Sequence, residues 1–222
     1  MSDAAGRGTT GDRGGPEGAR DLDRVVFFSD AVFAIAMTVL VLTLQLPAGT
    51  TDSEVAHALR TALPSVYAYA LSFAVISLYW LAHHRMFRYV RRLDPNLLVL
   101  NLALLGFVAF VPFPTSVLGD HGGTTAAVVF YASTMAILGS LISALWFYAS
   151  HEHLIAAEAS PTFIRHSLWR GLAVPVVFAA SIPIAFVNPY AAEYFWLTIV
   201  IWRVLLRRHY GTRGYRRAER GM

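Results

Sequence analysis

Six blocks of roughly twenty apolar residues constrain the fold of this chain more than any other feature. A helix of about twenty residues crosses a hydrocarbon layer of about 30 Å. Within that layer the backbone must satisfy its own hydrogen bonds, and long apolar runs without alternation favour helices over barrel strands. The pattern therefore predicts an all-α integral membrane protein. Its six expected transmembrane helices lie over residues 25–46, 64–82, 96–118, 124–149, 168–187 and 190–206.

The composition agrees with a membrane location. Charged residues make up 14% of the chain, against about 25% in soluble globular proteins. Apolar residues make up 56%, and there is no cysteine. The absence of cysteine excludes disulfide frameworks, thiolate metal sites and cysteine nucleophiles.

The two ends of the chain differ from its middle. Residues 1–23 are rich in Gly, Asp, Arg and Thr without apolar periodicity, so we expect a disordered cytoplasmic tail. This leader is too long and too acidic for a secretory signal, and the apolar block after it is about twice the usual length. We expect a six-helix transmembrane domain over 24–207 and a basic cytoplasmic tail over 208–222.

The distribution of arginine predicts the orientation. If the N-terminus is cytoplasmic, seventeen of the eighteen arginines lie on or toward the inner side, and Arg60 alone lies outside. The positive-inside rule then places both termini in the cytoplasm, and we expect a multi-pass protein of the plasma membrane. The sequence offers no soluble basic face with base-reading elements, so we expect no nucleic-acid partner.

Polar residues inside the first three spans are expected to meet at one depth. Asp30 lies one to two turns into the first span, and an ionisable residue there is a functional hypothesis by default. The second span returns to the same side and ends with Trp80, His83 and His84, and Asn101 lies two turns into the third span. These groups can satisfy one another's hydrogen bonds. The network either clamps the three helices together or takes part in gating or proton sensing.

Another face of the first span is apolar with a single hydroxyl. At 100° per residue from Ile35, Leu42 falls at about −20°, Val39 at about +40° and Thr38 at about −60°. Asp30 falls at about −140°, on the far side. Such a stripe more often faces lipid or core than a pore, and the spacing alone leaves these alternatives open.

The first span resembles the signature of the lysosomal potassium channel family, in its bacterial single-repeat form. The residues that carry this resemblance are RxxxFSD, with Arg24, Phe28, Ser29 and Asp30, and the following AVFAIAMTVLVL. It continues in Ser72-Phe73, in Trp80-x-x-His83-His84-Arg85 and in the segment VPFPT over 111–115. The resemblance covers about residues 24–118. Ala31 departs from it, because the family usually carries glycine there.

The resemblance implies a homotetramer in which the first helix of each subunit lines a central pore. It implies preference for potassium over sodium, and the chain has no TVGYG-like filter loop. By position, Ile35 matches the narrow isoleucine ring, Val39 and Leu42 match the apolar rings beyond it, and Thr38 matches a threonine layer. A ring of isoleucine side chains can gate by dewetting.

We therefore expect a potassium-selective leak channel that works in the lipid bilayer, with potassium as permeant and without cofactor or other metal. The alternative is a proton-coupled secondary transporter using Asp30 and His83, although such folds usually show paired repeats. An enzyme is not expected, since no nucleophile and base lie at workable spacing. His151 and His153 are two residues apart, which puts them on opposite faces of a helix and argues against a metal site.

Overall fold

The computed structural model describes residues 16–46, 51–156 and 161–198 of the 222-residue chain. These residues are helical apart from short connections and one isolated antiparallel bridge between Val90 and Ile155. Residues 189–198 are helical as well. The named elements are α1 (Pro16–Val39), the 3-10 helix η1 (Leu40–Thr43), α2 (Asp52–Thr61), α3 (Leu63–Phe87), α4 (Pro95–Phe110), α5 (Pro112–His121), α6 (Thr125–His151) and α7 (Pro161–Val187).

Four of the expected spans are present as helices long and apolar enough to cross a membrane. They are Glu17–Thr43, Leu63–Phe87, Pro95–His121 and Thr125–His151. The fifth expected span, 168–187, falls within α7, where Gly171–Val187 forms a shorter apolar helix. The sixth, 190–206, is helical as far as residue 198, and its remainder lies outside the described residues, as do the tails over 1–15 and 208–222.

The third span is divided by a proline. α4 ends at Phe110 and α5 begins at Pro112, with Val111 between them. Proline has no N–H to donate, and its ring clashes with the carbonyl four residues earlier. The Val111 N–H accordingly bonds to the Val108 carbonyl, three residues back, at 3.2 Å. Prolines inside the apolar blocks are expected to mark kinks or helix ends, and Pro112 marks such an end.

Side-chain caps define several helix starts. Asp94 precedes α4 and accepts a hydrogen bond from the Leu97 N–H at 2.8 Å. Thr51 and Glu54 form a reciprocal capping box at the start of α2. Such caps satisfy N–H groups that have no partner within the helix. At the chain start, α1 begins at Pro16, so helix extends eight residues upstream of Arg24.

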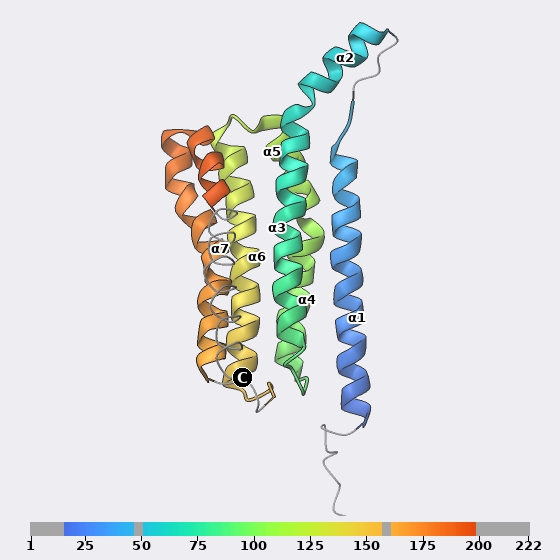
Figure 1. The fold of residues 1–222 in the computed structure, drawn as a ribbon, viewed down its shortest axis with the longest axis vertical. Helices are drawn as coiled ribbons and strands as arrows, with labels where there is room; N and C mark the ends of the chain where they lie inside the picture. Colours follow the sequence, from blue (N-terminus) through green and yellow to red (C-terminus); the bar gives the residue numbers. More distant parts are fainter. Residues whose placement is uncertain (1–15, 47–50, 157–160, 199–222) are drawn as a thin grey trace, which may run out of the picture.

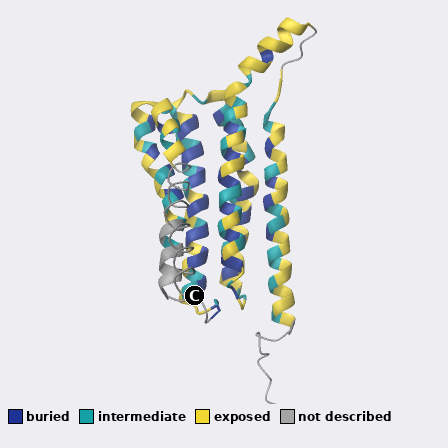
Figure 2. Cartoon of the chain, in the orientation of Figure 1, coloured by how far each residue is buried: buried dark blue, intermediate teal, exposed yellow. Residues whose placement is uncertain are grey.

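The helices form an elongated bundle with α1 at one edge (Figure 1). α6 packs most extensively on α7, and α1 packs on α3 and α4. α2 extends beyond the bundle at the end where α1 finishes (Figure 1). In the most apolar stretch of α6, half of the residues are buried inside the bundle. In the span that contains α1, the corresponding share is 22%. Buried residues are correspondingly concentrated along α6 and rarer on α1 (Figure 2).

Close packing between α6 and its neighbours depends on Gly139. A Cβ added there would lie 2.8 Å from Pro175 Cδ of α7 and 2.8 Å from the Tyr79 hydroxyl of α3. Small residues are the usual means by which membrane helices approach closely. Tyr79 donates its hydroxyl proton to the Met135 carbonyl of α6 at 2.8 Å, which holds α3 against the same site.

Two distant turns are joined at the end of the bundle where α1 begins. The Leu154 carbonyl accepts hydrogen bonds from the N–H groups of Arg91 at 2.8 Å and Arg92 at 3.4 Å. In return, the Ala156 N–H donates to the Tyr89 carbonyl at 2.8 Å. The α3–α4 turn and the segment after α6 therefore form one small, hydrogen-bonded unit.

Candidate functional site

α1 has one face that packs into the bundle. Phe33 and Leu40 are fully buried, and Ala36 is almost so. Seven residues make nearly two helical turns, so Phe33, Ala36 and Leu40 share one side of the helix. Ser29 lies on the same side and is also fully buried. This face fixes which way the rest of α1 points.

The opposite face of α1 has no partner within the described part of the chain. The side chains of Ile35 and Leu42 are 61% and 67% exposed, and Val39 is 37% exposed. Thr38 is exposed too, and its hydroxyl donates to the Ile35 carbonyl at 2.8 Å. Exposed residues run along the outer edge of α1 in Figure 2. The stripe recognised by helical spacing is therefore an unpacked face of the bundle.

One hydrogen bond joins α1 to α3 through Asp30. The Trp80 indole Nε1–H donates to Asp30 Oδ1 at 2.8 Å. Asp30 is partly buried. The ring of His84 lies beside Trp80, with the two ring centroids 5.4 Å apart. The carboxylate therefore meets a single tryptophan donor at this level of the bundle.

A second chain of hydrogen bonds joins α1, α4 and α3. Asn101 Nδ2 donates to Ser29 Oγ at 3.0 Å, and His83 Nε2 lies 2.9 Å from Asn101 Oδ1. Since a carbonyl oxygen only accepts, His83 carries its proton on Nε2. Ser29 in turn donates to the Val25 carbonyl at 2.8 Å. All three side chains are at most 1% exposed, so water cannot replace these bonds.

The expected polar residues thus form two separate chains rather than one network. His84 takes part in neither, and the buried Nδ1 atoms of His83 and His84 have no hydrogen-bond partner among the described residues. Arg24 and Phe28 of the signature lie on exposed positions instead. Asp30 and Ser29 therefore contact the bundle, whereas the first half of the signature does not.

A third polar cluster, which sequence reasoning missed, joins α3, α5 and α6. Thr115 Oγ1 donates to Ser72 Oγ at 2.7 Å, and Ser72 Oγ lies 3.0 Å from the Tyr131 hydroxyl. All three residues are buried. Ser72 and Thr115 belong to the recognised motifs, but Tyr131 stands in an apolar block with no signal beyond its own hydroxyl. The cluster holds α5 in place just after the proline break.

The structure describes no group of three or more His, Cys, Asp or Glu side chains that could hold a metal ion. His151 is exposed and stacks on Phe147, with ring centroids 6.0 Å apart. His153 is exposed and has a φ of 53°, a left-handed conformation that suits a turn.

The long apolar helices define an integral membrane protein, and comparison with known proteins specifies its class. The family model for the endosomal/lysosomal potassium channel TMEM175 matches residues 24–112. A potassium channel of Streptomyces collinus is 40% identical over 156 residues, which cover 65% of this chain and 75% of the relative. The chain belongs to the TMEM175 family, and it is a cation channel rather than an enzyme.

A solved structure shows the same fold. The crystal structure of a lysosomal potassium-selective channel TMEM175 homolog from Chamaesiphon minutus aligns with a TM-score of 0.74 at 27% identity. The alignment covers 84% of this chain and 97% of that one. The family resemblance inferred from the sequence is thereby confirmed.

A vertebrate relative is named for a different ion. The endosomal/lysosomal proton channel TMEM175 of Danio rerio is 24% identical over 186 residues. The alignment covers 81% of this chain but 36% of that protein. The family therefore includes relatives named for potassium and relatives named for protons.

Proposed function

We propose that this chain is a subunit of a potassium-selective leak channel, and that four copies place their α1 helices around one central pore. Each copy supplies six transmembrane helices within 24–207. The relatives named as potassium channels support the choice of ion. Lipid, potassium and three further copies of the chain are the partners that this proposal requires.

The unpacked face of α1 is the observation that carries the proposal. Ile35 and Leu42 are more than half exposed while Phe33 and Leu40, on the other side of the same helix, are fully buried. Phe33 and its neighbours fix the rotation of α1, so the Ile35 face points away from its own bundle. A central pore lined by this face gives every subunit the same contact, as a closed symmetric ring requires.

Ile35, Val39 and Leu42 then form the apolar constriction. A ring of isoleucine side chains excludes water from a narrow pore, so an ion must lose much of its hydration to pass. Potassium holds its hydration shell less tightly than sodium and is penalised less. The narrowest ring is assigned to Ile35, and Val39 and Leu42 form the apolar rings after it.

Thr38 provides the hydroxyl layer of the proposed pore. Its proton is donated to the Ile35 carbonyl at 2.8 Å. A hydroxyl that donates in this way keeps two acceptor lone pairs on its oxygen. Since Thr38 is exposed, those lone pairs can replace part of the hydration shell of a cation.

The polar chains of Asp30 and Ser29 act as clamps in this proposal. They join α1 to α3 and α4 on the side away from the Ile35 stripe. A clamp there holds α1 against its own bundle and so stabilises the fold of each subunit. The role in gating or proton sensing is the competing assignment for the same residues.

The orientation follows from arginine placement. Residues 1–23 and 208–222 are assigned as cytoplasmic tails, in a multi-pass protein of the plasma membrane. Arg20 and Arg24 lie in the first half of α1, and Arg88 and Arg92 follow α3, at the same end of the bundle. Arg60 of α2 lies at the other end.

Ion flux through purified protein in liposomes tests the proposal. Ile35→Ala should raise the potassium flux and lower the potassium-to-sodium ratio, since it widens the constriction. Ile35→Asn should have the same two effects, because a polar side chain lets water into the ring. Val41→Ala is the matched control, because Val41 is half exposed but lies about 120° away around the helix. An unchanged ratio in both Ile35 variants removes Ile35 from the constriction. Light scattering in detergent should give the mass of four chains. The mass of a single chain would contradict a central pore formed by four subunits.

A proton-coupled secondary transporter using Asp30 and His83 is the second candidate. It is favoured by the placement of two ionisable residues inside apolar spans and by the vertebrate relatives named as proton channels. A coupled transporter shows a fixed ratio of proton to substrate flux and saturates. A channel shows a reversal potential that follows the potassium gradient. Loss of all flux in His83→Gln at normal assembly would favour the transporter.

A further inference from the structure

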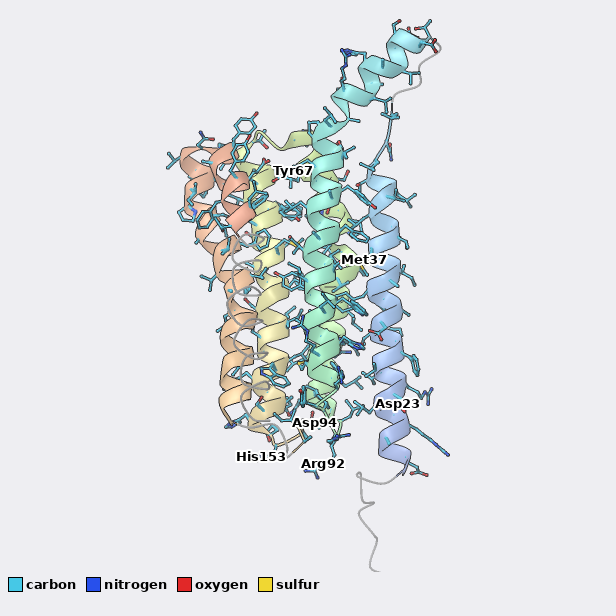
Figure 3. The ribbon with its side chains drawn as sticks, viewed as in Figure 1. Asp23, Met37, Tyr67, Arg92, Asp94 and His153 are labelled. Carbon is cyan, nitrogen blue, oxygen red and sulfur yellow. The ribbon has the colours of Figure 1, made fainter. Side chains whose placement is uncertain are left out.

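Four arginines crowd the end of α3 and the turn that follows it. Arg85 lies in the last turn of the helix, Arg88 ends it, and Arg91 and Arg92 lie in the turn. All four side chains are exposed. Figure 3 shows Arg92 at the end of the bundle opposite α2, near His153 and Asp94. We call these four residues the arginine cluster.

The backbone beneath the arginine cluster is held in place. Val90 is 2% exposed and pairs with Ile155 in the antiparallel bridge. The N–H groups of Arg91 and Arg92 both donate to the Leu154 carbonyl. The main chain is therefore anchored in the protein while the guanidinium groups point outward. This arrangement presents several positive charges at fixed positions rather than on a flexible tail.

The nearby carboxylates do not neutralise the arginine cluster. No guanidinium group of the cluster forms an ion pair within the described residues. Asp94, two residues after Arg92, accepts instead from the Leu97 N–H and the Tyr148 hydroxyl. Its two oxygens are thus used in capping α4 and in contacting α6. Among the described residues, four like charges within eight positions therefore have no protein counter-ion.

The position of the arginine cluster at the end of a membrane span indicates which molecules neutralise its charge. The cluster lies at the end of a 25-residue apolar helix, which is where a membrane span ends. Tyr89 and Trp146 pack beside it, with ring centroids 6.4 Å apart, and such aromatic residues gather at membrane interfaces. Lipid phosphates lie at that level, and basic residues next to spans attract anionic lipids.

We propose that the arginine cluster binds the phosphate groups of anionic membrane lipids. The guanidinium groups form bidentate contacts with phosphate oxygens, and the fixed backbone positions several of them at once. The inference is independent of the proposed pore, because it uses neither the α1 stripe nor the number of subunits. It also holds whichever side of the membrane the cluster faces.

Lipid titration of the purified full chain in detergent tests this proposal. The readout is the rise in melting temperature with phosphatidylglycerol, compared with phosphatidylcholine. Each arginine near a lipid surface contributes about fivefold in affinity. The variant Arg88→Gln/Arg91→Gln/Arg92→Gln should therefore need about a hundredfold more phosphatidylglycerol for the same rise. Arg60→Gln, at an exposed site on the other end of the bundle, is the matched control and should behave as wild type.

Two further variants keep the test decisive. Arg91→Gln/Arg92→Gln changes only two exposed side chains, and it should need about thirtyfold more lipid if the triple variant does not fold. Arg213→Gln/Arg216→Gln/Arg217→Gln removes the same charge from the basic tail. An equal loss in this tail variant, with none in the cluster variants, overturns the proposal. No preference for phosphatidylglycerol in wild type also overturns it, as does an equal temperature rise with inorganic phosphate at the same concentration.

Discussion

Replacing Asn101 by alanine should loosen α1 from the bundle. Asn101 is 1% exposed and bonds to Ser29 of α1 and to His83 of α3. The alanine variant leaves the His83 Nε2–H buried without an acceptor, which costs about 1–3 kcal/mol. The lost bond to Ser29 adds about 0.6–1.7 kcal/mol, the range for polar contacts between membrane helices. We expect a total loss of about 2–5 kcal/mol in the free energy of unfolding.

The assay is thermal unfolding of the purified protein in detergent. A loss of that size lowers the melting temperature by roughly 4–20 °C for a chain of this length. Leu102→Ala is the matched control, because Leu102 is the next residue of α4 and is 48% exposed, so its change should be small. If Asn101→Ala melts with wild type, the hydrogen-bond chain does not hold α1. If the Asn101→Ala variant melts at a lower temperature but keeps the wild-type potassium-to-sodium ratio in liposomes, the result favours a clamping role for these residues over a role in gating.

Substitutions at three other positions also have expected outcomes. Asp30→Asn should lower the yield of assembled protein in size-exclusion chromatography before it alters ion preference, and normal assembly with altered selectivity would contradict the clamp. Gly139→Ala should lower the melting temperature, because its Cβ would lie 2.8 Å from both Pro175 Cδ and the Tyr79 hydroxyl; an unchanged temperature would show that α6 and α7 can separate freely. His153→Val should destabilise the protein by about 1–2 kcal/mol, because β-branched residues fit a φ of 53° poorly, whereas His153→Gly should not. Equal melting of the two His153 variants would refute that reasoning.

The apolar blocks were sufficient to predict helices in the right places, because a membrane span is specified by length and composition. They do not set the division at Pro112, which follows from the missing N–H and the ring of proline rather than from hydropathy. The start of α1 at Pro16 was hidden by a polar composition that suits a tail as well as a helix. Local backbone chemistry, rather than hydropathy, decides these boundaries.

The polar contacts show a similar limit. Antiparallel neighbours and equal depth were enough to place Asp30, Trp80, His83 and Asn101 near one another. Which donor meets which acceptor depends on helix rotation, and this rotation pairs Asp30 with Trp80 while leaving His83 to Asn101. Tyr131 was missed because a buried tyrosine in an apolar block gives no periodic signal. The bridge at Val90 and Ile155 joins segments 65 residues apart, which no local pattern indicates.

A cysteine scan of α1 tests the proposed pore most directly, since the natural chain has no cysteine to interfere. Single cysteines are placed along the helix, and silver ion, which binds thiolates, is added during potassium current recording in a planar bilayer. We predict block at the exposed positions Ile35, Val39 and Leu42, and none at the buried positions Phe33 and Leu40. Block at Phe33 or Leu40 with none at Ile35, or no block at any position, would contradict a pore lined by this face of α1.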